Sequence, residues 1–294
     1  MAFNHLVLLG GGHTNVLLLK KWLMNPEMIP KCPISIISRD SHLVYSAMFP
    51  SVISKSIILN EALIDINLLA NQLKINFIKE EASCIDFKRE EIFFRKRPKI
   101  NFSSLVLNVG SQTKIIEKFA ELVRRNVACP IKPFLEAYDF IASEDNNDKT
   151  NELPFVIVGS GLAAVEVAFA LRKRWPMRKI CLVCEISKIR IKFLNYLKES
   201  NIDLRKDINF DYKKILLCTG NNPQQIISDN ILNLDKKGRI IINEEIKVKD
   251  FSNLYAVGDC AAMDTKNNNY SSGLFAVKVV DTLAKNIKES SENK

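Results

Sequence analysis

Two glycine turns, each set between a short apolar run and a helical segment, constrain the fold of this chain most strongly. The first turn, Gly10-Gly11-Gly12, follows the apolar run Leu6–Leu9. The second, Gly159-Ser160-Gly161, follows the apolar run Phe155–Val158. A buried strand, a glycine turn and a helix N-terminus form a seat for a pyrophosphate, because glycine lets the backbone approach and N–H groups face the charge. The sequence therefore predicts two βα units of the dinucleotide-binding type.

The two turns differ in how completely they match the dinucleotide pattern. Asn15 replaces the third glycine of the first turn, so this motif alone also fits an ordinary tight strand–helix turn. In such units an acid at the end of the second strand binds the ribose. Here the second predicted strand, Ile34–Ser38, places Ser38 and Arg39 at that position, so the acid is displaced or absent. The second turn is GxGxxA, and the strand Lys179–Cys184 ends in Glu185, where an acid grips a ribose 2′-hydroxyl. An ordinary βαβ unit with a coincidental glutamate is the alternative.

Further loops are expected at the carboxyl ends of predicted strands, where open α/β sheets bind their ligands. A polar and aromatic loop, His42–Pro50, follows the second strand, although it would also serve as a cap packed on the core. Later strands end at Asn108-Val109-Gly110-Ser111, at Gly220 and at Gly258-Asp259. The spacing of apolar residues also predicts an amphipathic helix over Glu61 to Gln72.

Composition indicates a globular protein with one large core or two smaller ones, because the chain has 294 residues and is 47% hydrophobic. The net charge of +9 fits either lysine-rich solvated faces or a basic surface for an acidic partner. No nucleic-acid motif is present, and the basic run Arg95 to Lys99 is interpreted as a hairpin tip.

Cysteine usage and the absence of targeting signals predict a cytoplasmic protein. Seven cysteines lie scattered without a disulfide framework, as expected in a reducing compartment, and no signal peptide is evident. The apolar stretch from Phe155 to Leu171 is short for a bilayer and carries Glu166 near its centre. No transmembrane segment is therefore predicted, and contact with a membrane surface stays open.

The motifs together resemble the flavoproteins with two dinucleotide-binding domains, the pyridine nucleotide–disulfide oxidoreductases. The chain is most similar to the type II NADH dehydrogenase branch, and especially to the flavoprotein domain fused to selenide, water dikinase. The residues behind the closer resemblance are Gly10-Gly11-Gly12-His13, Ser38-Arg39-Asp40, Tyr45-Ser46-x-Met48-x-Pro50, Ile64-Asp65-Ile66 and Ile131-Lys132-Pro133. The resemblance implies an α/β fold with two Rossmann-like, three-layer ββα domains, the second shortened and inserted in the first. The FAD-binding domain would comprise residues 1–127 and 221–294, and the NAD(H)-binding domain residues 128–220.

The resemblance also implies the site residues. FAD would place its pyrophosphate at Gly10 and Gly12, its adenine at the Ala82 backbone and a ribityl hydroxyl at Asp259. The helix containing Ala276 would direct its N-terminus at the flavin. The other implied cofactor contacts of this first domain and its loop are His13, Asn15, Arg39, Tyr45, Met48, Pro50, Asn108, Gly110, Ser111 and Gly258. NADH would contact Gly159, Gly161, Glu185 and Gly220, with Glu166 near the nicotinamide. The charge of Glu185 would favour NADH over NADPH.

The chain departs from the family in its cysteines and its length. The loop Ser46–Pro50 carries no cysteine, so a redox disulfide at that place is excluded. Cys181 and Cys184 are expected on opposite faces of one strand, and Cys129 is interpreted as structural, with a place beside the flavin as the alternative. The segment from Glu185 to Gly220 is short, so the nicotinamide side is expected to be incomplete. The C-terminal domain of relatives is expected to be missing.

The predicted function is that of an FAD-dependent oxidoreductase that takes hydride from NAD(P)H, with NADH favoured. Electrons would pass without a redox disulfide to an unidentified small-molecule or protein acceptor. A non-catalytic FAD-binding module or docking partner with a degenerate NADH domain is the main alternative, and an FAD-free NAD-binding dehydrogenase is a third. No metal ligands are predicted. The sequence leaves open the oligomeric state and whether the chain is part of a longer fusion.

Overall fold

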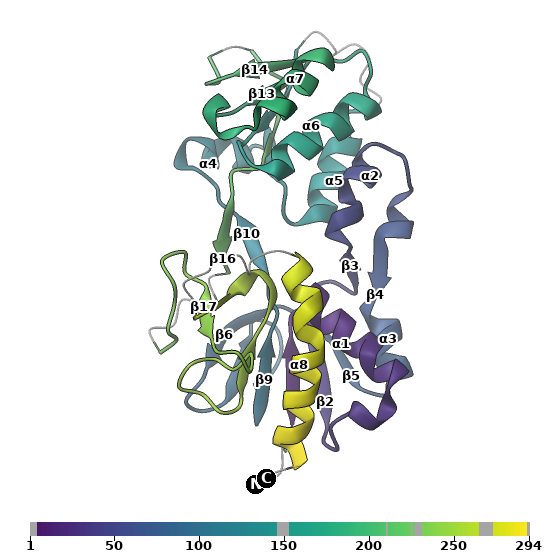
Figure 1. The fold of residues 1–294 in the computed structure, drawn as a ribbon, viewed down its shortest axis with the longest axis vertical. Coiled ribbons are helices and arrows are strands. Elements are labelled where there is room, and N and C mark those ends of the chain that lie inside the picture. The colour runs from purple at the N-terminus through teal and green to yellow at the C-terminus, as the bar shows by residue number, and fades with distance from the viewer. Residues whose placement is uncertain are drawn as a thin grey trace. The chain divides into compact units, whose positions relative to one another are not determined.

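A computed structural model describes residues 5–145, 153–209, 211–224, 226, 231–264 and 273–292. Contacts within the chain divide it into two compact units (Figure 1). Unit 1 comprises Met1–Leu43, Ile64–Ser111 and Pro223–Lys294, and unit 2 comprises Val44–Leu63 and Gln112–Asn222. Each unit is built on its own parallel sheet and has its own apolar core.

Unit 1 is organised around a sheet of five parallel strands with β1 (Leu6–Leu9) at its centre. In spatial order the strands are β18 (Leu254–Ala256), β9 (Ser104–Leu107), β1, β2 (Ile34–Ser38) and β5 (Asn76–Lys79). All four residues of β1 are buried, as expected for a parallel strand covered on both faces. Because later strands add to both sides of β1, the strand order reverses beside it, at the place where such sheets bind ligands.

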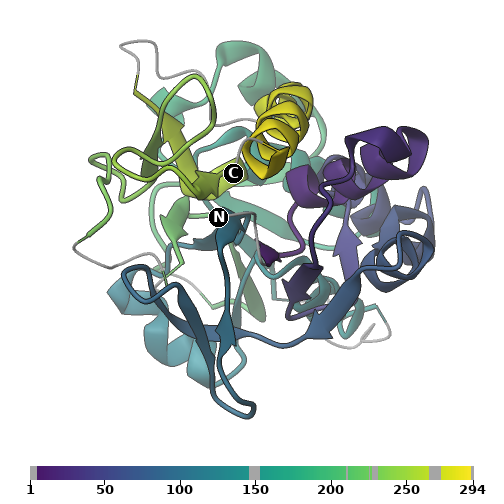
Figure 2. The same cartoon turned by 90° about the horizontal axis from the view of Figure 1, so that it is seen from below.

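Helices and smaller strand groups complete unit 1. The helices are α1 (His13–Met24), α3 (Ile66–Gln72) and α8 (Gly273–Glu292). Figures 1 and 2 show α8 lying along α1, in agreement with the contacts between them. The smaller strands are β6 (Ala82–Asp86), β7 (Glu91–Phe94) and β8 (Ile100–Asn101), which form an antiparallel sheet, and the parallel pair β17 (Ile240–Ile242) and β19 (Ala261–Met263).

The helix predicted from Glu61 to Gln72 is shorter in the structure. A 3-10 turn covers Leu59–Ala62, and the strand β4 (Leu63–Asp65) follows, paired with β3 (His42–Val44). The helix α3 begins only at Ile66, because the Asp65 side chain accepts a hydrogen bond from Leu68 N at 2.9 Å and caps it. The prediction was wrong over the first five residues because strand pairing with a distant segment and a helix cap took precedence over apolar spacing.

Unit 2 is built on a second sheet of five parallel strands. In spatial order they are β11 (Ala128–Pro130), β15 (Lys214–Leu217), β12 (Phe155–Val158), β13 (Ile180–Val183) and β14 (Ile202–Arg205). The helices are α2 (Phe49–Ile53), α4 (Glu117–Arg124), α5 (Phe134–Ala142), α6 (Leu162–Arg174) and α7 (Ile191–Glu199). The chain passes between the units through the ladders β3–β4 and β10 (Ser111–Thr113)–β16 (Asn221–Pro223).

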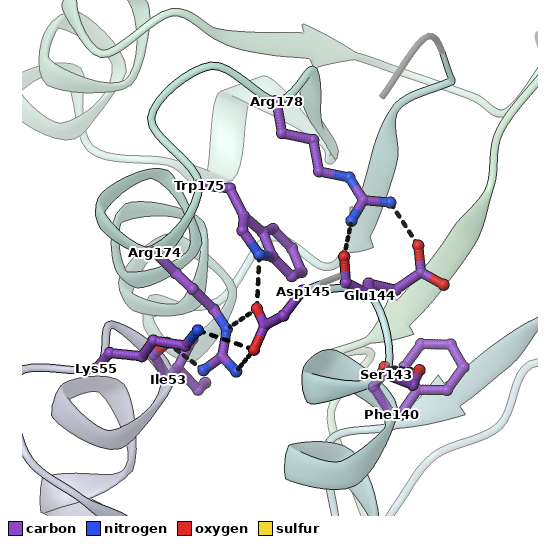
Figure 3. Close-up of polar contacts among 9 residues, drawn as sticks. All are labelled: Ile53, Lys55, Phe140, Ser143, Glu144, Asp145, Arg174, Trp175 and Arg178. Atoms are coloured by element: carbon purple, nitrogen blue, oxygen red, sulfur yellow. Dashed lines mark hydrogen bonds and ion pairs between the residues drawn. The ribbon is translucent and has the colours of Figure 1, made fainter. Parts of the chain in front are cut away.

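An ion cluster centred on the buried Arg174 attaches the segment 44–63 to the rest of unit 2 (Figure 3). The Arg174 guanidinium donates to both carboxylate oxygens of Asp145, at 2.7 and 2.5 Å, and to the Ile53 carbonyl at 2.9 Å. Lys55 Nζ lies 2.9 Å from the same carboxylate, and Trp175 Nε1 donates to it at 2.9 Å. Burial raises the pKa of Asp145, but hydrogen bonds from Arg174, Lys55 and Trp175 outweigh it and hold the pKa at about 2. The Asp145 carboxylate is therefore held in its charged form, paired with the Arg174 and Lys55 cations.

The predicted α/β fold with two Rossmann-like units is confirmed. The division by contacts differs from the predicted domain boundaries, because residues 44–63 and 112–127 belong to unit 2 rather than to the first domain. Cys181 and Cys184 lie in different apolar clusters, in agreement with opposite faces of one strand. None of the helices in the described part of the chain combines the length and apolar character needed to cross a bilayer.

Candidate cofactor-binding sites

The first candidate site lies in unit 1 where β1, β9 and β18 end side by side. Gly10 follows β1 with φ +100°, a left-handed conformation, and its N–H donates to the Ile37 carbonyl at 2.8 Å. Gly12 is the N-cap of α1, which has no side-chain cap and no acidic residue in its first turn. No carboxylate of the helix therefore competes with an anion at this positive end.

Asn108, which directly follows β9, connects the first turn of α1 to the residue after β18 by hydrogen bonds. It is 3% exposed, its Oδ1 accepts from Asn15 N at 3.0 Å, and its Nδ2 donates to the Val257 carbonyl at 3.0 Å. A Cβ on Gly12 would lie 2.4 Å from Asn108 Oδ1, and one on Gly258 would lie 2.6 Å from Nδ2. Glycine at both positions is thus required by the protein's own packing.

Asn15 takes the place of the third glycine by bonding to the turn. Its side chain is fully buried, and its Nδ2 donates to the Gly10 carbonyl at 2.9 Å. Its Oδ1 is buried and has no hydrogen-bond partner among the described residues. The amide therefore bridges helix and turn where glycine would allow direct contact, which the sequence pattern alone did not reveal.

Asp259 and its neighbours form the second part of this site. Asp259 lies in the 3-10 turn Gly258–Cys260 after β18, and its Oδ2 accepts from Ser111 Oγ at 2.9 Å. Gly110 and Gly258 take left-handed φ values of +69° and +73°, which glycine adopts without strain. The carboxylate is partly exposed and is oriented by the hydroxyl of Ser111, the first residue of β10.

The other predicted FAD contacts are distributed over both units. His13 is the first residue of α1 and is partly buried, Ala82 begins β6, and Arg39 follows β2 and donates to the Asp40 carboxylate at 3.0 and 3.1 Å. Ala276 lies in α8, and its side chain is outside the described part of the structure. Tyr45, Met48 and Pro50 belong by their contacts to unit 2.

The second candidate site lies in unit 2 where β12 ends, and its two glycines differ in kind. Gly159 has φ +154°, and a Cβ there would lie 2.3 Å from the Cys218 carbonyl oxygen, so the fold itself requires glycine. Gly161 is the N-cap of α6 with φ −84° and ψ 168°, a conformation open to any residue. Among the described residues, no atom lies within 4 Å of where a Cβ on Gly161 would be. The space beside Gly161 is therefore left free by the protein.

Glu185 follows β13 and is tied to this turn, because its N–H donates to Ser160 Oγ at 2.8 Å. Its carboxylate is exposed and pairs with Lys188, which lowers the pKa of Glu185. Gly220 follows β15 with φ +95°, and its carbonyl accepts from Lys114 N at 2.8 Å. Glu166 lies on α6 with its side chain exposed. The structure thus brings Gly159, Gly161, Glu185 and Gly220 to the carboxyl edge of one sheet.

The cysteines near these sites are unreactive in character. Burial raises the pKa of Cys129 to about 11 and that of Cys181 to about 12, and it also raises the pKa of Cys184. All are free thiols, and thiolates are the reactive form. Among the described residues, no group of three or more His, Cys, Asp or Glu side chains is placed to hold a metal ion.

Sequence analysis missed two residues of the second site, Ser160 and Lys188. Both lie within short loops flanking predicted motifs, so their positions were visible but their side-chain contacts were not. A hydroxyl inside the glycine turn and a lysine three residues after the ribose acid are signals that could have drawn attention to them.

The residues present fit two dinucleotides. Two helix N-termini free of acidic residues face positions where phosphate would bind, and Gly161 leaves a cradle that a Cβ would fill. Asp259 and Glu185 each offer a carboxylate to a hydroxyl of the bound molecule. Binding of this kind orients two coenzymes, and the redox chemistry belongs to the cofactors.

Comparisons with known proteins found sequence relatives and structural neighbours. No family model matches the chain. The chain is 23% identical over 252 residues to human ferroptosis suppressor protein 1, covering 74% of this chain and 65% of that protein. It is 21% identical over 285 residues to the NADH dehydrogenase-like protein YutJ of Bacillus subtilis, covering 88% of this chain and 77% of that protein. The match therefore spans less than two thirds of the human relative's length.

A solved structure shares the fold of this chain. The covalent putidaredoxin reductase–putidaredoxin complex aligns with a TM-score of 0.79 and 16% identity, covering 98% of this chain and 76% of that chain. The likeness to this solved structure shows the fold alone, and the sequence relatives are proteins named as a ferroptosis suppressor and as NADH dehydrogenase-like. They do not support the narrower resemblance to the flavoprotein domain fused to selenide, water dikinase.

Proposed function

We propose that this protein is an FAD-dependent NAD(P)H oxidoreductase, in which unit 1 binds FAD and unit 2 binds the nicotinamide coenzyme. The sequence relatives support this assignment, because one of them is named as NADH dehydrogenase-like and matches 88% of the chain. The arrangement of two parallel sheets, each with a glycine turn at its point of strand reversal, supports it independently.

The open space beside Gly161 is the observation that carries the proposal. Packing in unit 2 does not require glycine at this position, because its φ suits any residue and a Cβ there would meet none of the described atoms within 4 Å. A pyrophosphate approaching the N-terminus of α6 supplies the reason, because a methyl group would occupy the space it needs. This argument favours a coenzyme-binding unit over a degenerate one.

The short segment of unit 2 led us to expect an incomplete nicotinamide side, and the elements that it forms bear on this expectation. Although the segment from Glu185 to Gly220 is short, it contributes α7, β14 and β15, and the sheet has all five parallel strands. In unit 1, Gly10 and Gly12 would hold the FAD pyrophosphate and Asp259 a ribityl hydroxyl. FAD, when bound, supplies the ring system that carries electrons from coenzyme to acceptor.

Glu185 favours NADH over NADPH in this proposal, because its carboxylate repels a 2′-phosphate. The electron acceptor receives electrons without a redox disulfide, since Ser46 to Pro50 contains no cysteine. The shared fold with putidaredoxin reductase supports a small electron-transfer protein as the acceptor, with a small molecule as the alternative.

Anaerobic mixing of the FAD-loaded protein with NADH tests the proposal. We expect the visible flavin band to bleach within seconds, and dithionite to bleach it to the same extent as a control for a redox-competent flavin. A protein that binds FAD and is bleached by dithionite but not by NADH or NADPH would be a flavin-binding module. A protein that is colourless after purification and takes up no FAD would contradict the role of unit 1.

A further inference from the structure

Lys188 lies against the acid that the proposed function assigns to the coenzyme ribose. A 3-10 turn covers Ile186–Lys188, in which Lys188 N donates to the Glu185 carbonyl at 3.0 Å. Because residues three apart nearly eclipse in such a turn, the lysine side chain is directed back over Glu185. The Lys188 ammonium and a carboxylate oxygen of Glu185 form an ion pair.

Neither partner of this pair is buried, so both are available to a ligand. The side chains of Glu185 and Lys188 are 57% and 64% exposed. Glu185 is fixed to the glycine turn through the bond from its N–H to Ser160 Oγ, which places the pair beside the N-terminus of α6. An exposed pair of this kind contributes little to folding, so packing gives no reason for the lysine.

The pair changes the charge that a ribose 2′ position meets. Glu185 alone presents a negative charge, which excludes a 2′-phosphate carrying a charge of about −2. With Lys188 beside it the net charge of the pair is zero, and the ammonium becomes a donor for phosphate oxygens. The carboxylate keeps its ability to accept hydrogen bonds from the hydroxyls of an unphosphorylated ribose.

We propose that Lys188 is a coenzyme-specificity residue that makes unit 2 accept 2′-phosphorylated as well as unphosphorylated adenosine coenzymes. This inference rests on the proposed function, since it takes the second glycine turn as the coenzyme site. It goes beyond that function by naming the residue that sets the strength of the preference for NADH. Glu185 and Lys188 act in opposite directions on the same phosphate.

Isothermal titration calorimetry with ADP-ribose and 2′-phospho-ADP-ribose tests the inference on the full FAD-loaded chain. These probes carry the adenosine half of the coenzymes and cannot reduce the flavin. The variants are Lys188→Met, Glu185→Gln and, as a matched control, Lys198→Met. Lys198 is an exposed lysine in the last turn of α7, ten residues further along the chain and outside the 3-10 turn that carries Lys188.

We expect the wild-type protein to bind both probes with dissociation constants within about tenfold of each other. Lys188→Met should weaken the phosphorylated probe about tenfold and change the unphosphorylated probe less than about threefold, as for a unit charge about 6 Å from a doubly charged phosphate in water. Glu185→Gln should tighten the phosphorylated probe, and Lys198→Met should change neither.

The inference is overturned if Lys188→Met weakens both probes equally, if it weakens neither, or if Lys198→Met reproduces its effect. Failure of the wild-type chain to bind either probe also overturns it. The proposed function fails separately: a chain that binds both probes as expected, but whose flavin is not bleached by NADH or NADPH, would retain the specificity pair without the oxidoreductase activity.

Discussion

Replacing Gly161 by alanine is expected to separate coenzyme binding from folding. The backbone there has φ −84° and ψ 168°, which alanine adopts freely, and the added Cβ would meet none of the described atoms within 4 Å. Gly159, two residues earlier, provides the matched control. There φ is +154°, and a Cβ would lie 2.3 Å from the Cys218 carbonyl oxygen.

The two substitutions therefore differ in their expected cost to folding. At Gly161, alanine is a poorer N-cap by about 0.5–1 kcal/mol, and the smaller entropy of the unfolded chain returns about 0.4–1 kcal/mol. The free energy of unfolding should thus change by less than about 0.5 kcal/mol. At Gly159, backbone strain and overlap with a carbonyl should lower it by about 2–4 kcal/mol.

At Gly161 the expected effect on NADH binding is large, although the expected effect on folding is small. A methyl group on Gly161 fills the space through which a pyrophosphate reaches the N-terminus of α6. Loss of one charge-assisted hydrogen bond to phosphate corresponds to about 1.5–3 kcal/mol, or roughly a 10- to 150-fold rise in the NADH dissociation constant. The FAD content should stay that of the wild-type protein, because Gly161 lies in unit 2.

Urea unfolding and anaerobic titration of the flavin with NADH measure the two quantities on the same preparations. The reasoning is refuted if Gly161→Ala binds NADH as tightly as the wild-type protein. It is equally refuted if Gly161→Ala loses as much stability as Gly159→Ala, because the glycine would then serve the fold and not a ligand.

Three further perturbations test other parts of the structure. Asn108→Ala should lower the free energy of unfolding by about 2–4 kcal/mol and reduce bound FAD, because it removes the acceptor of Asn15 N and one of the donors to the buried Val257 carbonyl. An unchanged denaturation midpoint would contradict this role of Asn108. The pKa of folded Asp145, about 2, lies below its unfolded value of about 4, so its contribution is full above pH 4 and is lost as pH falls towards 2. Asp145→Asn should therefore cost about 2 kcal/mol at neutral pH and flatten the acid limb of a stability–pH curve, whereas a parallel limb would exclude this role. Alkylation of the native protein at neutral pH should label the exposed Cys84 and spare Cys181, with the same pattern after NADH is added, since a redox disulfide would release new thiols.

The sequence was informative where the determinants of structure are local. The two strands, glycine turns and following helices each lie within about twenty residues, so their order could be predicted from apolar runs and glycine spacing. The position of Glu185 after β13 follows from the same local order. The α/β fold class follows because such units alternate along the chain.

Other features depend on residues far apart in the sequence and could not be predicted. The start of α3 at Ile66 depends on the pairing of β4 with β3 and on the Asp65 cap. The attachment of residues 44–63 to unit 2 involves Arg174 and Asp145, more than eighty residues later in the chain. The bracing of the first turn by Asn108 likewise joins three strand ends that only the folded sheet brings together.

The four crossings of the chain between the units have a consequence for synthesis on the ribosome. Unit 2 needs residues 44–63 and 112–222, so its last residue is made while unit 1 still lacks β18, an edge strand of its sheet. The inserted unit is thus the first that translation supplies in full, and β9 lacks its edge partner β18 until about 150 more residues have been made. A gene fragment encoding residues 112–222 would omit Ile53 and Lys55 and leave the Arg174–Asp145 cluster without two of its partners.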